Sequence, residues 1–152
     1  MNERLEGLDE ELECEKTKDE SGITSFEEAK KKRKPFHYWT VNGEDHKMKL
    51  TTGMIAKLEN KYRTNIMNLI TASDIPPLSV MLTIAQAALA PWEHGTTIDR
   101  VYGIYDKWLK EGGSQSRLLT HVIMPTLAVS GFFTVAQAES LMKELEEDAS
   151  LM

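Results

Sequence analysis

The amino-acid sequence predicts a mainly α fold, in which one N-terminal β-hairpin packs on a bundle of about five or six helices. Three observations support this prediction. A turn signal, Asn42-Gly43, lies between two segments that alternate in polarity. From Thr51 onward the apolar residues recur at helical spacing instead. Residues 1–34 are dominated by charge, so we expect a disordered charged arm before the folded part.

The predicted arm changes sign along its length. Acidic residues crowd the stretch from Glu3 to Glu20, and the block KKKRK follows at Lys30 to Lys34. Aromatic and branched apolar residues are scarce there, so burial could not offset the entropy lost on ordering. We therefore predict a disordered acidic-then-basic arm over residues 1–34 and a helical domain over residues 35–152. The basic block could stay solvated or associate with the arm's own acids, bind an acidic protein, or bind nucleic acid.

The segment HYWTVNGEDHKMKLT is predicted to form a hairpin, because Asn and Gly both tolerate the positive φ angles of a tight turn. Alternation then separates two faces. The predicted apolar face comprises Trp39, Val41, Met48 and Leu50, with His37 and His46 beside them. The opposite face, which meets water, carries Tyr38, Thr40, Lys47 and Lys49. A lone hairpin is only marginally stable in water, so we expect its apolar face to pack on the helices.

The helical part is predicted to begin with Thr51 or Thr52 as an N-cap, and the short apolar segment NIMNLI follows. Pro77 suits the opening turn of the next helix, whose segment LSVMLTIAQAALA is apolar on nearly every side and is expected to be central. Thr96 is the predicted cap of the following helix, which Gly112-Gly113 ends. The apolar stripe expected on that helix is Ile98, Val101, Tyr105, Trp108 and Leu109.

A further helix is expected over the segment SQSRLLTHVIMPTLAVSG. Pro125 removes a backbone donor inside it and clashes with the preceding turn, which predicts a kink or break near Met124. Thr134 and Gln137 have the spacing of a capping box and predict the start of a last helix. The stripe expected on the last helix is Val135, Ala138, Leu141, Met142 and Leu145.

The sequence has no motif that indicates catalysis or a bound cofactor. It contains no G-x-S-x-G, P-loop, G-x-G-x-x-G or H-E-x-x-H, and its four histidines lack metal-ligand spacing. We therefore predict a protein that is not an enzyme and needs neither metal nor cofactor. The net charge of −6 disfavours non-specific nucleic-acid binding as the main role. A single cysteine, no secretory signal and no membrane-spanning stretch predict a cytoplasmic setting.

The C-terminal end has the character of an interaction surface. We expect the two adjacent phenylalanines of the segment SGFF not to point together into one core. An amphipathic terminal helix is readily shared with a partner. Contact with a partner and simple docking on the core are both compatible with this end of the chain.

The order and spacing of five segments resemble the tail assembly chaperones of long-tailed bacteriophages, particularly those of Gram-positive hosts and their prophages. The segments are YWTVNGEDHKMKLT, LENKYRTNIMNLI, LTIAQAALAPWEHG, IDRVYGIYDKWLKEGGS and SGFF, and the likeness extends over about residues 36–133. The positions that carry most of the resemblance are the Tyr38-Trp39 strand, the turn after it, and the aromatic helix that ends in Gly-Gly. Residues 1–34 match no element of that family.

The resemblance implies a small, mostly helical, non-virion protein that acts in the cytoplasm of the bacterial host while the phage tail is built. Such proteins bind the long tape measure protein, keep it soluble and assist polymerisation of the tail tube around it. The tube protein is contacted through a longer, frameshifted form, and self-association is possible. Candidate partner-binding residues are Tyr38, Trp39, Val41, Phe132, Phe133, Leu141, Met142 and Leu145. Two alternatives are a generic bacterial helical adaptor and a nucleic-acid-binding phage regulator that uses the KKKRK block.

Overall fold

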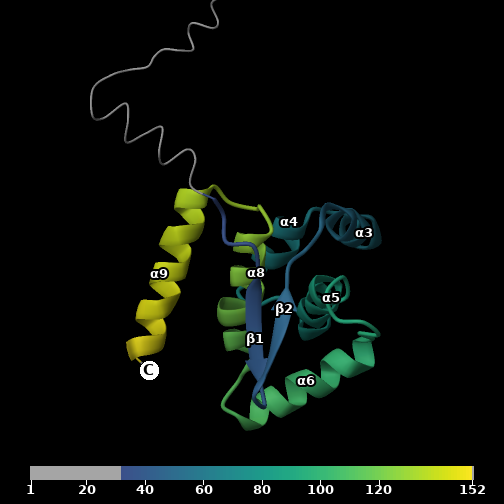
Figure 1. Ribbon diagram of the computed structural model, residues 1–152. Helices are drawn as coiled ribbons and strands as arrows, with labels where there is room; N and C mark the ends of the chain where they lie inside the picture. The colour runs from purple at the N-terminus through teal and green to yellow at the C-terminus, as the bar shows by residue number, and fades with distance from the viewer. Residues whose placement is uncertain (1–31, 152) are drawn as a thin grey trace, which may run out of the picture. The chain divides into compact units, whose positions relative to one another are not determined.

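The computed structural model describes residues 32–151, with side chains described up to residue 147. Within that range the predicted fold class is confirmed, since a single two-stranded hairpin is followed by helices (Figure 1). The arm predicted over residues 1–34 lies outside the described residues, apart from its last three. The elements are β1 (His37–Val41), β2 (Glu44–Met48), α3 (Thr52–Tyr62), α4 (Ile66–Thr71), α5 (Leu78–Leu89), α6 (Ile98–Lys110), α7 (Gln115–Leu118), η1 (Leu119–Ile123), α8 (Met124–Val129) and α9 (Val135–Leu151).

The hairpin forms in the register that the alternation predicts. Asn42 and Gly43 make the turn, with φ angles of 53° and 79°, and Trp39 lies opposite His46. This two-residue turn matches the natural twist of the strands, and it needs the left-handed conformation at both positions. The side chains of the inner face are buried or half-buried, whereas those of the outer face are half-buried or exposed. The expected burial of the apolar hairpin face on the helices is thus confirmed.

Helix α5 is the central helix, as predicted from its apolar sequence. It begins directly after Pro77, which occupies the cap position and not the first turn of the helix. In Figure 1 the helix lies beside β2, and the backbone N–H of Lys49 donates to the carbonyl of Ala88 over 3.1 Å. Its fully buried side chains include Met81, Ile84, Ala85, Ala88 and Leu89.

Helix α6 closes the core at the turn end of the hairpin. The indole of Trp39 meets the indole of Trp108 edge to face, with ring centroids 5.6 Å apart. The chain leaves this helix through Gly112 at a φ of 102°, and Gly113 then lies so close to Trp108 that a Cβ atom there would overlap the indole. Gly112-Gly113 therefore ends the helix as predicted, and the second glycine is required by packing.

Two predictions for α6 are wrong. The cap is Thr97, whose side chain accepts a hydrogen bond from the backbone N–H of Arg100. Thr96 is buried and bonded elsewhere, because its hydroxyl donates to the carbonyl of Glu93 over 2.7 Å. Leu109, assigned to the apolar stripe, is 40% exposed, and Ile104 fills the buried position instead.

Pro125 does not break its helix. The chain is helical without interruption from α7 through η1 to α8, and η1 is a wider π-helical turn directly before the proline. The backbone N–H of Met124 reaches the carbonyl of Leu119, five residues back. A π turn inserts one extra residue, and this accommodates a proline that cannot donate to the carbonyl of His121. Of the predicted kink or break near Met124, the break is therefore wrong, and the helix widens locally at this place.

Candidate partner-binding surface

The segment that joins α8 to α9 is held by hydrogen bonds to distant parts of the chain. The hydroxyl of Ser130 donates to the carbonyl of Thr126 over 2.6 Å and accepts from the backbone N–H of Leu50 over 2.9 Å. Gly131 turns the chain with a φ of 99°. The guanidinium of Arg33, in the basic block, donates to the carbonyl of Phe133 over 2.6 Å. These contacts fix the point from which α9 starts.

The start of α9 is the predicted capping box. The hydroxyl of Thr134 accepts from the backbone N–H of Gln137, and the Gln137 amide oxygen accepts from the backbone N–H of Thr134. The two bonds measure 3.1 and 2.9 Å, so two backbone donors that a helix start leaves unpaired are satisfied reciprocally. Helix α9 therefore has a well-defined first turn.

The apolar stripe of α9 is only partly covered. Phe132 and Phe133 are half-buried and both pack against the core, contrary to the expectation that they would not point into it together. Ala138 is buried, whereas the following apolar residues of the stripe, Leu141, Met142 and Leu145, are half-buried. Those three do not belong to the side chains that pack against the core. In Figure 1 this helix stands beside α8 at the edge of the bundle.

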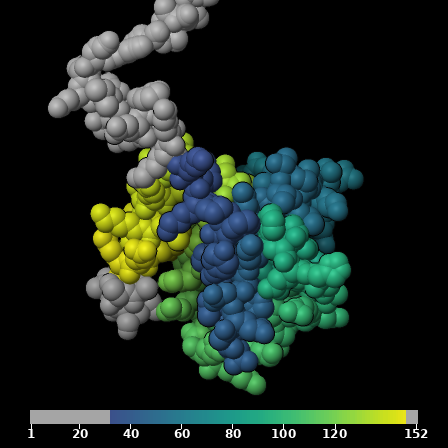
Figure 2. All heavy atoms as spheres, in the orientation of Figure 1, coloured from purple at the N-terminus to yellow at the C-terminus, as the bar shows by residue number. Residues whose placement is uncertain are grey.

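The three candidate residues on the hairpin differ in accessibility. Trp39 and Val41 are 3% and 2% exposed and belong to the core. Tyr38 is 50% exposed on the outer face, because neighbouring residues of a strand point to opposite sides. Figure 2 shows the hairpin crossing the middle of the visible surface, with α9 at its left. Of these three residues, Tyr38 alone exposes its side chain to solvent.

The outer hairpin face also carries an aromatic and basic group that the sequence analysis missed. The rings of Phe36 and Trp92 meet edge to face at 5.0 Å, and the Trp92 indole N–H donates to the carbonyl of Lys49. The ammonium nitrogens of Lys47 and Lys49 lie 4.5 and 5.7 Å from the Phe36 ring centroid. Such cation–π contacts stabilise an exposed lysine by about 0.5–1 kcal/mol. The lysine alternation was visible in the sequence, but the approach of Trp92 was not.

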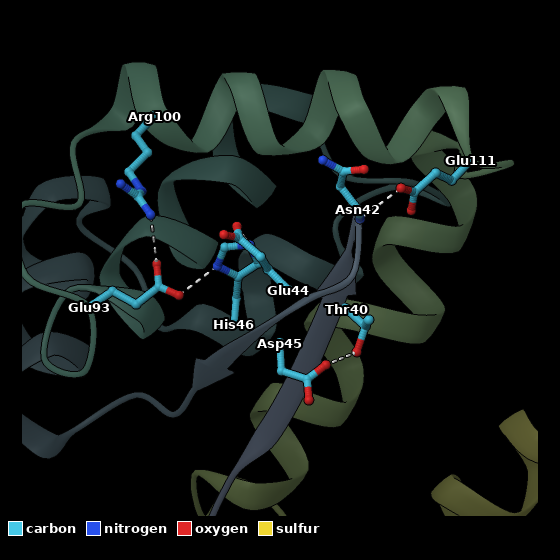
Figure 3. Close-up of polar contacts among 8 residues, drawn as sticks. All are labelled: Thr40, Asn42, Glu44, Asp45, His46, Glu93, Arg100 and Glu111. Atoms are coloured by element: carbon cyan, nitrogen blue, oxygen red, sulfur yellow. Dashed lines mark hydrogen bonds and ion pairs between the residues drawn. The ribbon is translucent and has the colours of Figure 1, made fainter.

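Polar contacts join the hairpin to the end of α6 and to the loop between α5 and α6 (Figure 3). The backbone N–H of Asn42 donates to the Glu111 carboxylate over 2.7 Å, which ties the turn to the end of α6. Inside, Nδ1 of the buried His46 lies 2.5 Å from a carboxylate oxygen of Glu93. Arg100 lies 3.9 Å from the other oxygen of Glu93. This chain of contacts satisfies a histidine on an apolar face, so we assign it a structural role.

His37 is the second histidine on the inner face. Its Nε2 is buried without a hydrogen-bond partner, and burial lowers its pKa from 6.5 to about 4. A hydrogen bond between His37 and the backbone of His121 raises this pKa, but by less than burial lowers it. A contact that raises a histidine pKa favours the charged ring, as donation to a carbonyl does. The carbonyl of His121 is the one that Pro125 leaves without its usual α-helical donor.

Within residues 32–151, no group of three or more histidine, cysteine, aspartate or glutamate side chains is placed to hold a metal ion. In the same part of the chain, no helix has both the length and the apolar character needed to cross a membrane. Comparisons with protein-family models, with curated proteins and with solved structures gave no match for the chain.

Proposed function

We propose that the chain is a tail assembly chaperone of the long-tailed phage type. In this role it binds the tape measure protein, keeps it soluble and assists polymerisation of the tail tube, without becoming part of the virion. The observation that supports the proposal best is the half-buried stripe of Leu141, Met142 and Leu145, which does not pack against the core and lies on a helix whose start is anchored.

A long helical client needs this kind of surface. Together with Ala138, the stripe has the spacing i, i+3, i+4, i+7, which is how one amphipathic helix contacts another. Three half-buried side chains offer a small contact area, which suits repeated, reversible binding along an extended chain better than one permanent interface. A net charge of −6 helps to keep such an assembly soluble. The proposed action is binding, and no chemical step is part of it.

The test is co-expression with the tape measure protein, followed by measurement of how much of that protein stays soluble and co-purifies. Leu141→Gln with Leu145→Gln makes two of the three half-buried stripe residues polar without changing a core residue. The matched control is Leu109→Gln with Ile75→Gln, since these side chains are 40% and 42% exposed elsewhere on the surface. Phe132 and Phe133 are unsuitable here, because both pack against the core and their loss would damage the fold.

We expect a large gain in soluble client that the stripe variant loses and the control retains. If both variants retain the gain, the function stands and the surface is wrong, and Tyr38→Ser on the hairpin becomes the next variant. If the unaltered chain neither solubilises nor binds the tape measure protein, the chaperone proposal fails. The generic adaptor then becomes the leading hypothesis. Binding of nucleic acid that weakens steeply with salt would support the regulator instead.

A further inference from the structure

The flanks of the α9 stripe are acidic on both sides. On a helical wheel, Glu144 lies beside the stripe on one side and Glu146 on the other, and both side chains are exposed. The single basic residue of the helix, Lys143, points away from the stripe. Within residues 32–151, neither Glu144 nor Glu146 makes an ion pair.

Counting the charges makes the imbalance clear. Residues 135–147 contain four glutamates (Glu139, Glu144, Glu146 and Glu147) and one lysine, so their net charge is 1 − 4 = −3. In paired helices, the residues that flank the apolar seam decide which partners and orientations are accepted. A second copy of α9 would bring glutamates against glutamates at both flanks. Like charges facing each other disfavour that pairing.

We propose that the natural occupant of the α9 stripe is an amphipathic helix of another protein, with lysine or arginine on both sides of its apolar face. The identification of that protein as the tape measure protein rests on the proposed function. The chemistry of the occupant rests on the half-buried stripe, which does not pack against the core, and on the exposed glutamates beside it. Apolar contact supplies the affinity, and charge complementarity selects basic helices and excludes the chain's own copy.

Other classes of partner fit this surface poorly. Nucleic acids and anionic lipid surfaces carry the same sign of charge as Glu144 and Glu146, so both are repelled. An acidic helix would meet the same repulsion as a second copy. A helix with an apolar face and no flanking charges would bind the stripe through apolar contact, but without the added attraction of opposite charges. A basic-flanked helix is therefore the occupant that both features of α9 favour.

The experiment uses the full chain and two synthetic helices about three heptads long, identical in apolar positions. One helix carries lysine at the flanking positions and the other carries glutamate. Affinities are measured by fluorescence anisotropy at low and high salt. The test variant combines Glu144→Lys and Glu146→Lys. The matched control combines Asp74→Lys and Asp106→Lys, the same change in charge at exposed sites away from α9.

We expect the lysine helix to bind about tenfold more tightly than the glutamate helix at low salt, with a smaller ratio at high salt. The preference should disappear or reverse in the flank variant and persist in the control. Equal affinity for the two helices, or an unchanged preference in the flank variant, would overturn the inference. So would a stable dimer of the unaltered chain that is lost in Leu141→Gln with Leu145→Gln.

The outcome separates this inference from the proposed function. If the lysine helix is preferred but the tape measure protein is not kept soluble, α9 binds basic helices and the client has been misidentified. If the tape measure protein is solubilised through Leu141 and Leu145 but charge has no effect, the function stands and the flank argument is wrong.

Discussion

Acid should weaken this fold through His37, which is held in its neutral form. Burial against the helices is the largest cause of its low pKa of about 4, and the nearby His121 and Lys34 add to it by charge repulsion. The hydrogen bond with the backbone of His121 opposes the shift but does not offset burial. We therefore use His37→Gln as the test variant, because glutamine keeps a hydrogen-bond donor in the side chain but cannot take up a proton in this pH range.

The sign and size of the effect follow from the two pKa values. The unfolded ring titrates near 6.5, so between pH 6.5 and about 4 the unfolded state holds a proton that the folded state lacks. The stability linked to the neutral His37 ring is complete above pH 6.5 and is lost progressively as the pH falls toward 4. A difference of one pKa unit corresponds to about 1.4 kcal/mol, so the unfolding free energy falls by about 3 kcal/mol in full and by about 2 kcal/mol at pH 5.

The assay is urea unfolding followed by circular dichroism at pH 7.5 and pH 5. We expect the unfolding free energy of the parent chain to fall between these conditions by about 2 kcal/mol more than that of His37→Gln. The matched control is His94→Gln, because that histidine is exposed in the loop between α5 and α6. The comparison cancels any loss of stability that the substitution causes at both pH values. Equal pH dependence in the parent and in His37→Gln would refute the argument.

Three further predictions concern stability. Trp39→Ala should cost about 3–5 kcal/mol in urea unfolding because it empties a core site, whereas Tyr38→Ala on the exposed face should change stability by about 0.5 kcal/mol or less. Gly43→Val should cost about 1–2 kcal/mol, since the turn needs a positive φ; an unchanged midpoint would contradict the assigned turn. Thr134→Ala should cost about 1 kcal/mol, seen by hydrogen exchange as faster opening of the first turn of α9 than of α5.

The features predicted correctly are those that depend on neighbours in the sequence. The Asn42-Gly43 turn fixes the register, and the register fixes which side chains face inward. The Thr134 and Gln137 capping box uses residues three positions apart, so local chemistry alone determines it. Fold class follows from these signals and from helical spacing, because each local preference agrees with the final arrangement.

The errors arise where a distant contact decides between local options. Thr96 and Thr97 are both acceptable caps by residue type. Glu93 and Gln86 bind Thr96 into the core, and this leaves Thr97 to cap α6. Leu109 likewise has the right spacing for the stripe but lies at the exposed end of the helix. Spacing predicts the side of a helix on which a residue lies, but not how far along the helix the core extends.

For the candidate surface on α9, too, the sequence predicts which side chains share a face but not how far the core covers that face. Spacing identifies the apolar face of α9 equally well whether that face is docked or free. The segment from which α9 starts is anchored by Arg33, which donates to a carbonyl one hundred residues away, and no local pattern encodes that contact. In our proposal, Glu144 and Glu146 control which partner this partly covered face accepts, because an apolar helix without flanking charges could pair with its own copy. With like charges on its borders it remains available for a basic helix.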